Sequence, residues 1–258
     1  MMTQTKTAKS IVSGVLLIDK PQGMTSQQVV SKVKYLLKSD VHDSKKAGHT
    51  GTLDPMATGL LPICLGEATK FSHYQLDAIK SYHAIIKLGE QTDTGDAEGE
   101  IIATSPVPHV TQAMLQSVIK QFLGEIMQVP PMYSALKKDG KKLYELAREG
   151  IEVERAARPL IIYELSLTPL SDQQLQLTVT CSKGTYVRVL AEDIAKALGT
   201  LGHLTALRRV QTGDFEIANA ITLADFAALD IAARFDKLLA VDACIHSLPS
   251  LLLDDSES

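Results

Sequence analysis

The stretch GHTGTLDPMATG, residues 48–59, runs directly into the apolar segment LLPICL, residues 60–65. The glycines of the first segment permit positive φ angles and close approach of the backbone to other groups. The proline at position 55 disfavours helix at the residue before it, Asp54. We therefore predict a glycine-rich loop over residues 45–59 that leads into a buried strand over residues 60–65.

Asp54 is the single carboxylate of this loop. A carboxylate in such a position can act as a nucleophile, a general base or a metal ligand. Loop aspartates more commonly bond to their own backbone in an Asx turn. The loop by itself leaves the catalytic and the structural interpretation open.

Outward from this loop, the spacing of apolar residues predicts a mixture of strands and helices. The first helix has an N-cap candidate at Thr25 or Ser26. Because the elements follow one another without a regular βαβ rhythm, the order favours the α+β class. The expected strands cover residues 14–19, 60–65, 82–88, 160–167, 175–179 and 203–211, and the expected helices cover residues 25–37, 67–76, 111–123, 142–149, 187–198 and 222–229.

The composition is that of an ordinary globular protein, with 45% hydrophobic and 22% charged residues in 258. No run approaches the 18 apolar residues of a membrane-spanning helix, and the polar N-terminus lacks the apolar region of a secretory signal. Three cysteines stand far apart, at positions 64, 181 and 244. This spacing suits neither a disulfide framework nor a zinc site, so we expect a cytoplasmic protein.

The net charge of −4 by itself argues mildly against a nucleic-acid partner. The charges are segregated along the chain, however. Residues 1–80 carry net +4 and residues 131–213 net +3, whereas residues 81–130 carry −4 and residues 214–258 carry −7. Solvated helix faces and an RNA-binding surface both remain open from this pattern.

Common catalytic and phosphate-binding motifs are absent. The chain contains no G-x-x-x-x-G-K-[ST], G-x-G-x-x-G, G-x-S-x-G or H-E-x-x-H motif. The acidic loop around residues 93–99 resembles half of a calcium loop, but Thr94 and Ser105 occupy the positions where carboxylates are required. We therefore expect no metal site.

Several basic and aromatic groups remain. In KGTYVR, residues 183–188, Tyr186 and Arg188 share a face if the segment is extended. Such a pair can stack a base and hold a carboxylate or phosphate, or it can be a packed tyrosine beside a surface arginine. The lysine-rich turn KKDGKK, residues 137–142, and the two arginines of LRR, residues 207–209, add cations suited to phosphate contacts or to a solvated surface.

Together the motifs resemble one family, over about residues 12–245 and in order. It is the TruB family, bacterial tRNA pseudouridine synthases that act on the T-loop uridine called position 55. The matching segments are GVLLIDKPQGMTS (14–26), GHTGTLDPMATGLLPICLGEATK (48–70), KSYHA (80–84), GEQTDTGDAEG (89–99), QVPPMYSALKKDGKKLYELAREG (128–150), CSKGTYVRVLAEDIA (181–195) and GHLTALRRVQTGDF (202–215).

The resemblance implies the pseudouridine synthase fold, a mixed, largely antiparallel central sheet flanked by helices with an RNA-binding cleft. It implies a catalytic domain over residues 12–247, after a flexible N-terminus over residues 1–11. Family members usually continue into a PUA-like RNA-binding module. We expect residues 248–258 to be a tail where this module starts and is otherwise absent.

The implied reaction breaks the uracil glycosidic bond, turns the base and joins C5 to C1′. Asp54 matches the catalytic aspartate, which attacks either C1′ or the uracil ring; both routes stay open. Arg188 matches the arginine that pairs with it, and a cation there favours the ionised carboxylate. Tyr82 matches the tyrosine that stacks on the flipped base, where it is also placed to help remove the C5 proton.

The resemblance assigns supporting roles to further residues. No metal or organic cofactor is implied, because the reaction involves neither redox chemistry nor group donation. The implied partner is the tRNA T-arm, bound by a monomer without contact to a membrane. The supporting residues are Tyr186 as a second pocket tyrosine, His49 in the space that the nucleotide vacates, Leu207 lining the pocket, Lys20 and Lys70 in structural or phosphate-binding roles, and Asp96 as a polar contact.

Two alternatives belong to other function classes. One is a non-catalytic tRNA-binding folding factor that retains the pocket, which binding of T-arm RNA without isomerisation would indicate. The other is a metal-dependent phosphotransferase using Asp54, Asp93 and Asp96, which turnover unaffected by EDTA would eliminate. The absence of a nucleotide-cradling loop argues against the second.

Overall fold

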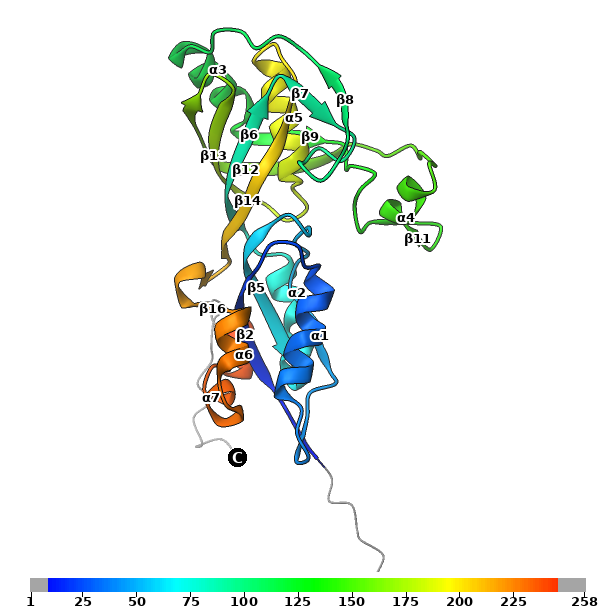
Figure 1. The fold of residues 1–258 in the computed structure, drawn as a ribbon, viewed down its shortest axis with the longest axis vertical. Helices are drawn as coiled ribbons and strands as arrows, with labels where there is room; N and C mark the ends of the chain where they lie inside the picture. The colour runs from blue at the N-terminus through cyan, green and yellow to red at the C-terminus, as the bar shows by residue number, and fades with distance from the viewer. Residues whose placement is uncertain (1–8, 246–258) are drawn as a thin grey trace, which may run out of the picture.

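The computed structural model describes residues 9–245, which form an elongated molecule built along one large sheet (Figure 1). Its ten strands run in the order β16-β2-β5-β14-β6-β13-β12-β9, with β4 paired to β5 and β15 paired to β14. Most neighbours are antiparallel, and β14–β5 and β16–β2 are parallel. The prediction of a mixed, largely antiparallel sheet is therefore confirmed.

The strands of this sheet vary widely in length; α1, α2, α6 and α7 lie along the half that contains β2 and β5, α3 and α5 lie beside the other half, and α4 stands out to one side (Figure 1). The strands are β2 (Gly14–Lys20), β4 (Ala47–His49), β5 (Thr58–Leu65), β6 (Lys80–Leu88), β9 (Gly124–Gln128), β12 (Arg158–Ser171), β13 (Gln174–Cys181), β14 (Gly202–Thr212), β15 (Phe215–Glu216) and β16 (Ile221–Thr222). The α-helices are α1 (Ser26–Leu37), α2 (Ser72–Leu76), α3 (Gln112–Phe122), α4 (Leu143–Arg148), α5 (Val187–Ala197), α6 (Leu223–Ala228) and α7 (Ile231–Phe235).

Three small two-stranded sheets and three 3₁₀ helices complete the described residues. The sheets pair β1 (Ser10–Ile11) with β3 (His42–Asp43), β7 (Glu90–Thr92) with β8 (Ile101–Thr104), and β10 (Lys137–Lys138) with β11 (Lys141–Lys142). The 3₁₀ helices cover Gly66–Lys70, Ile217–Asn219 and Val241–Ile245. The expected tail at 248–258 and most of the expected N-terminal segment at 1–11 lie outside the described residues.

Helix α1 shows why the first predicted helix forms where it does. Thr25 is its N-cap: the Thr25 side chain accepts a bond from the backbone of Gln28, and the Gln28 side chain accepts one in return. The apolar face expected from the spacing is buried. It consists of Val29, Val30, Val33, Leu36 and Leu37.

Other predictions need correction. The helix expected over residues 67–76 is divided into the 3₁₀ helix Gly66–Lys70 and the short α2, with Phe71 between them. The loop expected over residues 45–59 contains strand β4, which pairs antiparallel with β5. Strands β7, β8 and β9 and helix α7 were not predicted.

The two halves of the sheet are joined by a short parallel contact. Strand β14 pairs with β6 over most of its length, but with β5 only at Arg208–Thr58 and Arg209–Gly59. Gly59 has a φ of +103°, and a Cβ there would lie 2.2 Å from the carbonyl oxygen of Arg209. This position therefore requires glycine both for its backbone angle and for the close approach of β14.

We expect Gly59→Ala to lower the free energy of unfolding by about 3 kcal/mol or more, because it adds a backbone clash to the cost of a positive φ. Gly199→Ala is the matched control, since Gly199 has a φ of +84° and no atom within 4 Å of its built Cβ. The control should lose only about 1 kcal/mol. Equal losses in urea unfolding would contradict the packing argument.

Candidate active site

A cavity of about 250 Å³ lies beside the joint between β5 and β14. The glycine-rich loop forms one wall, the start of α5 forms another, and strands β6 and β14 form the floor. The lining consists of residues 51–54, 133–135 and 184–188 together with Leu76, Lys80, Tyr82, Leu207 and Arg209.

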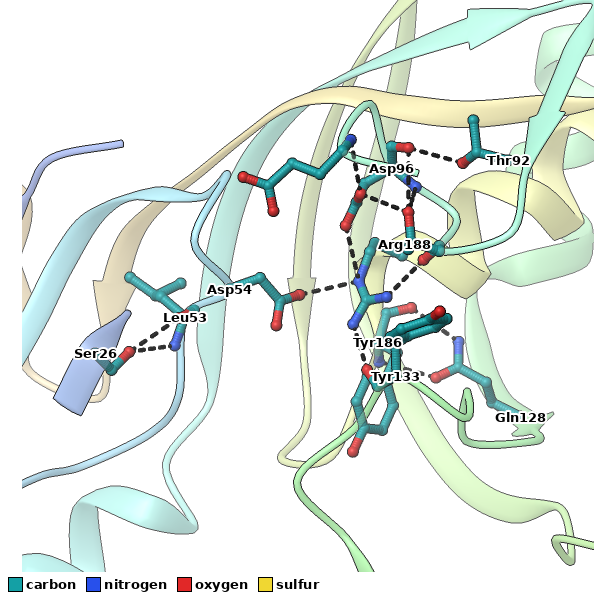
Figure 2. Close-up of polar contacts among 11 residues, drawn as sticks. Ser26, Leu53, Asp54, Thr92, Asp96, Gln128, Tyr133, Tyr186 and Arg188 are labelled. Carbon is teal, nitrogen blue, oxygen red and sulfur yellow. Dashed lines mark hydrogen bonds and ion pairs between the residues drawn. The ribbon is translucent and has the colours of Figure 1, made fainter. Parts of the chain in front are cut away.

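The structure brings Asp54 and Arg188 together in this cavity. Arg188 Nε lies 2.9 Å from Asp54 Oδ2, and Figure 2 shows the carboxylate reaching across from the loop to the guanidinium. The arginine side chain is 5% exposed, whereas that of Asp54 is 35% exposed. The ion pair therefore orients a carboxylate that remains open to the cavity.

The Arg188 guanidinium is held from three sides. Its Nη1 donates to the carbonyl of Thr94 at 2.6 Å, and its Nη2 donates to the carbonyl of Tyr133 at 2.7 Å. Asp96 Oδ2 lies 3.6 Å from Nε, next to the shorter contact with Asp54. With its donors engaged by fixed groups, Arg188 has one available orientation (Figure 2).

Asp96 is a buried support of this arrangement. Its Oδ1 accepts hydrogen bonds from the Thr94 hydroxyl at 2.7 Å and from the backbone of Glu98 at 3.0 Å. Because Arg188 stands between Asp96 and the cavity, Asp96 contacts the site through the arginine and is absent from the cavity lining.

Two residues near the N-terminus position the loop that carries Asp54. Ser26, the first residue of α1, accepts a hydrogen bond from the backbone N–H of Leu53 at 2.8 Å and donates one to its carbonyl at 3.0 Å. Lys20 is fully buried, and its ammonium donates to the carbonyls of Pro21, Pro55 and Ala57. Burial lowers the pKa of Lys20 to about 8. Two of these carbonyls, those of Pro55 and Ala57, belong to the loop, and Lys20 does not line the cavity.

Three predicted pocket residues line the cavity: Tyr82, Tyr186 and Leu207. Burial raises the pKa of Tyr82, while the charge of Arg209 opposes this shift. Burial also raises the pKa of Tyr186. Both phenols are therefore protonated at neutral pH.

The side chain of Gln128 fixes the backbone of Tyr186, where α5 begins. Gln128 accepts from the Tyr186 N–H at 2.8 Å and donates to its carbonyl at 3.2 Å (Figure 2). Gln128 is buried at the end of the edge strand β9. It therefore ties this edge of the sheet to the cavity wall.

Besides Asp96 and Lys20, two further predicted site residues, His49 and Lys70, do not line the cavity. His49 lies at the end of β4, where its Nδ1 accepts a hydrogen bond from the backbone of Gly51 at 3.3 Å. Burial, followed by the charge of Arg209, lowers the pKa of His49, so the ring is neutral at pH 7. Lys70 is exposed at the end of the 3₁₀ helix Gly66–Lys70 and pairs with Glu67. The structure thus keeps His49 beside the loop and does not bring Lys70 to the site.

Lys80 and Arg209 also line the cavity. From the sequence, Arg209 was expected only in phosphate contacts or on a solvated surface, and Lys80 had no predicted role. The sequence did contain a signal that placed both residues at the cavity. Lys80 is two residues from Tyr82 and Arg209 is two residues from Leu207, so each shares a strand face with a predicted pocket residue.

Residues 9–245 contain no group of three or more His, Cys, Asp or Glu side chains arranged to hold a metal ion. No helix in the same part of the chain has both the length and the apolar character needed to cross a membrane.

Two family models match the chain in succession. The TruB family pseudouridylate synthase N-terminal domain matches residues 39–187. The tRNA pseudouridylate synthase B C-terminal domain matches residues 188–252. Asp54 lies in the first match, and Arg188 is the first residue of the second.

Several relatives are highly identical to this chain. The tRNA pseudouridine synthase B of Psychrobacter cryohalolentis is 69% identical over 246 residues, a match covering 95% of this chain and 68% of the relative. The protein of the same name from Neisseria meningitidis is 49% identical, with 97% of this chain and 80% of the relative covered. Some relatives are longer: the chain spans 65% of the one from Psychrobacter arcticus.

Solved structures share the fold. A chain in the crystal structure of a Cbf5–Nop10–Gar1 complex superposes with a TM-score of 0.69 and 28% identity, covering 90% of this chain and 61% of that one. A chain in an H/ACA RNP bound to a substrate RNA containing 2′-deoxyuridine gives 0.65 and 26%, covering 90% and 60%. The family models, the identity to the relatives and the shared fold all lead to the same assignment: the chain belongs to the TruB family of pseudouridylate synthases.

Proposed function

We propose that this protein isomerises uridine to pseudouridine at position 55 in the T-loop of tRNA. The observation that carries the proposal is the Asp54–Arg188 ion pair, which presents a partly exposed carboxylate to a cavity flanked by two tyrosines. Membership of the TruB family and the relatives named tRNA pseudouridine synthase B support the same reaction.

In the proposed mechanism, the target base leaves the RNA stack and enters the cavity. Tyr82 stacks on the uracil and takes part in removing the C5 proton, while Tyr186 and Leu207 pack around the ring. The Asp54 carboxylate attacks C1′ or the uracil ring, the C1′–N1 bond breaks, and C5 joins C1′ after the base turns. Arg188 orients Asp54 for this attack, and Asp96 holds Arg188.

We propose supporting roles for the other residues. His49 occupies the space that the flipped nucleotide leaves in the RNA. Lys20 positions the loop through the carbonyls of Pro55 and Ala57, and Lys70 contacts phosphate at a distance from the cavity. The hairpin of β10 and β11 lies at one side of the molecule (Figure 1), and its lysines suit phosphate contacts with the T-arm.

We propose that residues 12–247 form one catalytic unit that acts as a monomer in the cytoplasm, without metal or cofactor. Support for a single unit comes from β14, which crosses from one half of the sheet to the other. A non-catalytic RNA-binding factor is less consistent with the site, because RNA binding does not require a carboxylate oriented by a buried arginine.

Asp54→Asn should abolish isomerisation of a T-arm stem-loop, because an amide cannot act as the nucleophile. RNA affinity should change by less than about threefold, since the substitution preserves size and adds no clash. The control is Asp40→Asn, at an exposed position after α1. Pseudouridine formation and gel retention are measured together, and isomerisation by the Asp54→Asn variant would exclude the proposed nucleophile.

Tyr82→Leu and Tyr82→Phe separate the two proposed roles of this side chain. Leucine removes both stacking and the hydroxyl, and should slow isomerisation by about 100-fold or more with a modest change in affinity. Phenylalanine retains stacking, so the decrease in rate of the Tyr82→Phe variant measures the contribution of the hydroxyl alone. Single-turnover rates at saturating RNA measure both. Normal turnover by the leucine variant would refute the role of Tyr82.

Ser26→Ala should lower activity indirectly, because Ser26 holds the backbone of Leu53 next to Asp54. The backbone of Leu53 loses two buried hydrogen bonds, which should cost about 2 kcal/mol of stability. Displacement of the adjacent Asp54 should slow isomerisation by roughly 10-fold to 100-fold in the folded protein. Ser31→Ala, exposed on the same helix, is the control. If the Ser26 variant retains the wild-type rate, Ser26 does not position Asp54.

A further inference from the structure

Two buried cations lie together beneath the cavity. Arg209 is 1% exposed and Lys80 is 8% exposed, and both line the cavity. They meet at Gly51 in the glycine-rich loop: a Cβ built on Gly51 would lie 3.4 Å from both Arg209 Nη1 and Lys80 Cε. The two positive charges therefore act on the same small volume.

Neither cation has a carboxylate within ion-pair distance among residues 9–245. Arg209 donates to the carbonyls of Leu60 at 2.8 Å and Gly51 at 3.1 Å. Lys80 likewise donates to carbonyls at the end of α2, including that of Ala78 at 2.7 Å. Carbonyl dipoles satisfy the N–H groups, but they do not cancel the charges.

Other arginines of the same region are compensated. Arg188 faces the carboxylates of Asp54 and Asp96. Arg208, next to Arg209 in β14, pairs with Asp19 through two bonds of 3.0 and 2.7 Å. A buried charge without a counter-charge is costly in free energy, so a negative charge that develops in the cavity beside Arg209 and Lys80 would be stabilised there.

The charge of Arg209 shifts the pKa values of neighbouring groups in and beside the site. It is the second cause, after burial, of the lowered pKa of His49 and of Lys80, whose pKa falls to about 8. Arg209 also lies directly opposite Tyr82 in the pairing of β14 with β6. A base stacked on Tyr82 would therefore rest within the field of this guanidinium.

The proposed reaction places negative charge on that base. If Asp54 attacks C1′, a carboxylate oxygen bonds to C1′ and the electron pair of the C1′–N1 bond stays with uracil, which becomes an anion. If Asp54 adds to the ring, the electrons of the ring double bond move onto the carbonyl oxygen as an enolate. Either route needs a positive charge near the uracil when the barrier is crossed.

We propose that Arg209, with Lys80 beside it, stabilises the negative charge that develops on uracil during the reaction. This inference rests on the proposed isomerase function. Arg209 acts through its charge across the cavity and does not bond to the reacting atoms, so it is an electrostatic positioning residue. It also holds the loop through the carbonyl of Gly51, which places its charge and Asp54 in a fixed relation.

An RNA phosphate is the other anion that these cations could attract. The burial of Arg209 and its position between Tyr82 and Gly51 favour a base over a phosphate, because phosphate contacts need an accessible guanidinium. The two possibilities make different predictions. A phosphate contact contributes to affinity and to its salt dependence, whereas a contact with the uracil anion contributes to rate.

The test compares Arg209→Gln with Arg208→Gln, a matched change at the adjacent, compensated arginine. Each is assayed in single turnover at saturating T-arm RNA, carrying either uridine or 5-fluorouridine at the target position. Consumption of the target nucleoside is measured by mass spectrometry after digestion. The fluorine withdraws electrons and makes uracil a better leaving group, so this substrate depends less on the protein's positive charge.

We expect Arg209→Gln to slow uridine consumption by about 100-fold and 5-fluorouridine consumption by a clearly smaller factor. RNA affinity and its salt slope should stay within about twofold of wild type, and Arg208→Gln should retain the wild-type rate. Arg209→Lys retains the positive charge but lacks the planar guanidinium, so this variant should keep part of the rate that Arg209→Gln loses. Thermal unfolding of each variant identifies losses that come from misfolding.

Should Arg209→Gln fail to fold, Lys80→Met provides the same comparison, with a smaller loss but the same dependence on the substrate. Equal losses on the two substrates would overturn the inference and leave a structural role. A weakened affinity with a lower salt slope would overturn it in favour of phosphate. An inactive wild-type protein would instead refute the proposed isomerase function, so the two failures are distinguishable.

Discussion

The site depends on the two-residue contact where β5 meets β14. Gly59 has no side chain, so the backbone of Arg209 approaches closely, and the Arg209 side chain then reaches back to the carbonyls of Leu60 and Gly51. The same contact thus joins the two halves of the sheet and anchors the loop that carries Asp54. Together with the Asp54–Arg188 ion pair, it fixes the spacing between the loop in one half and the tyrosines in the other.

The loop is further held by groups from separate parts of the chain. Lys20 binds its carbonyls from β2, Ser26 binds Leu53 from α1, and Arg188 binds Asp54 from α5. Each contact is a hydrogen bond or ion pair from a largely buried side chain, so alternative loop conformations would leave polar groups unsatisfied. A glycine-rich segment, which is flexible by itself, is in this way fixed for chemistry.

Local signals explain which parts of the fold were predictable. Strands β2 and β5 are continuous apolar runs, β6 and β13 alternate, and α1 has helical spacing, so each was recognisable from its own sequence. Strand β9 was missed because it is five residues long and its outward side chains include Glu125 and Met127. Its identity as a strand comes from pairing with β12, a contact that only the folded sheet provides.

The site divides in the same way. Asp54 and Arg188 were found through motifs, but their 2.9 Å contact joins residues 134 positions apart and is a property of the fold. Arg209 was missed because its sequence neighbour Arg208 is chemically identical, and only the strand's orientation separates them. Arg208 points to Asp19, whereas Arg209 lies beneath the cavity.

The net charge of −4 was a misleading guide for a related reason: it is a sum over the whole chain, whereas the energy of a charge depends on distance and dielectric. Exposed acidic side chains are screened by solvent and salt, but the buried cations around Asp54 are not, so a few hidden residues determine the field that a substrate meets.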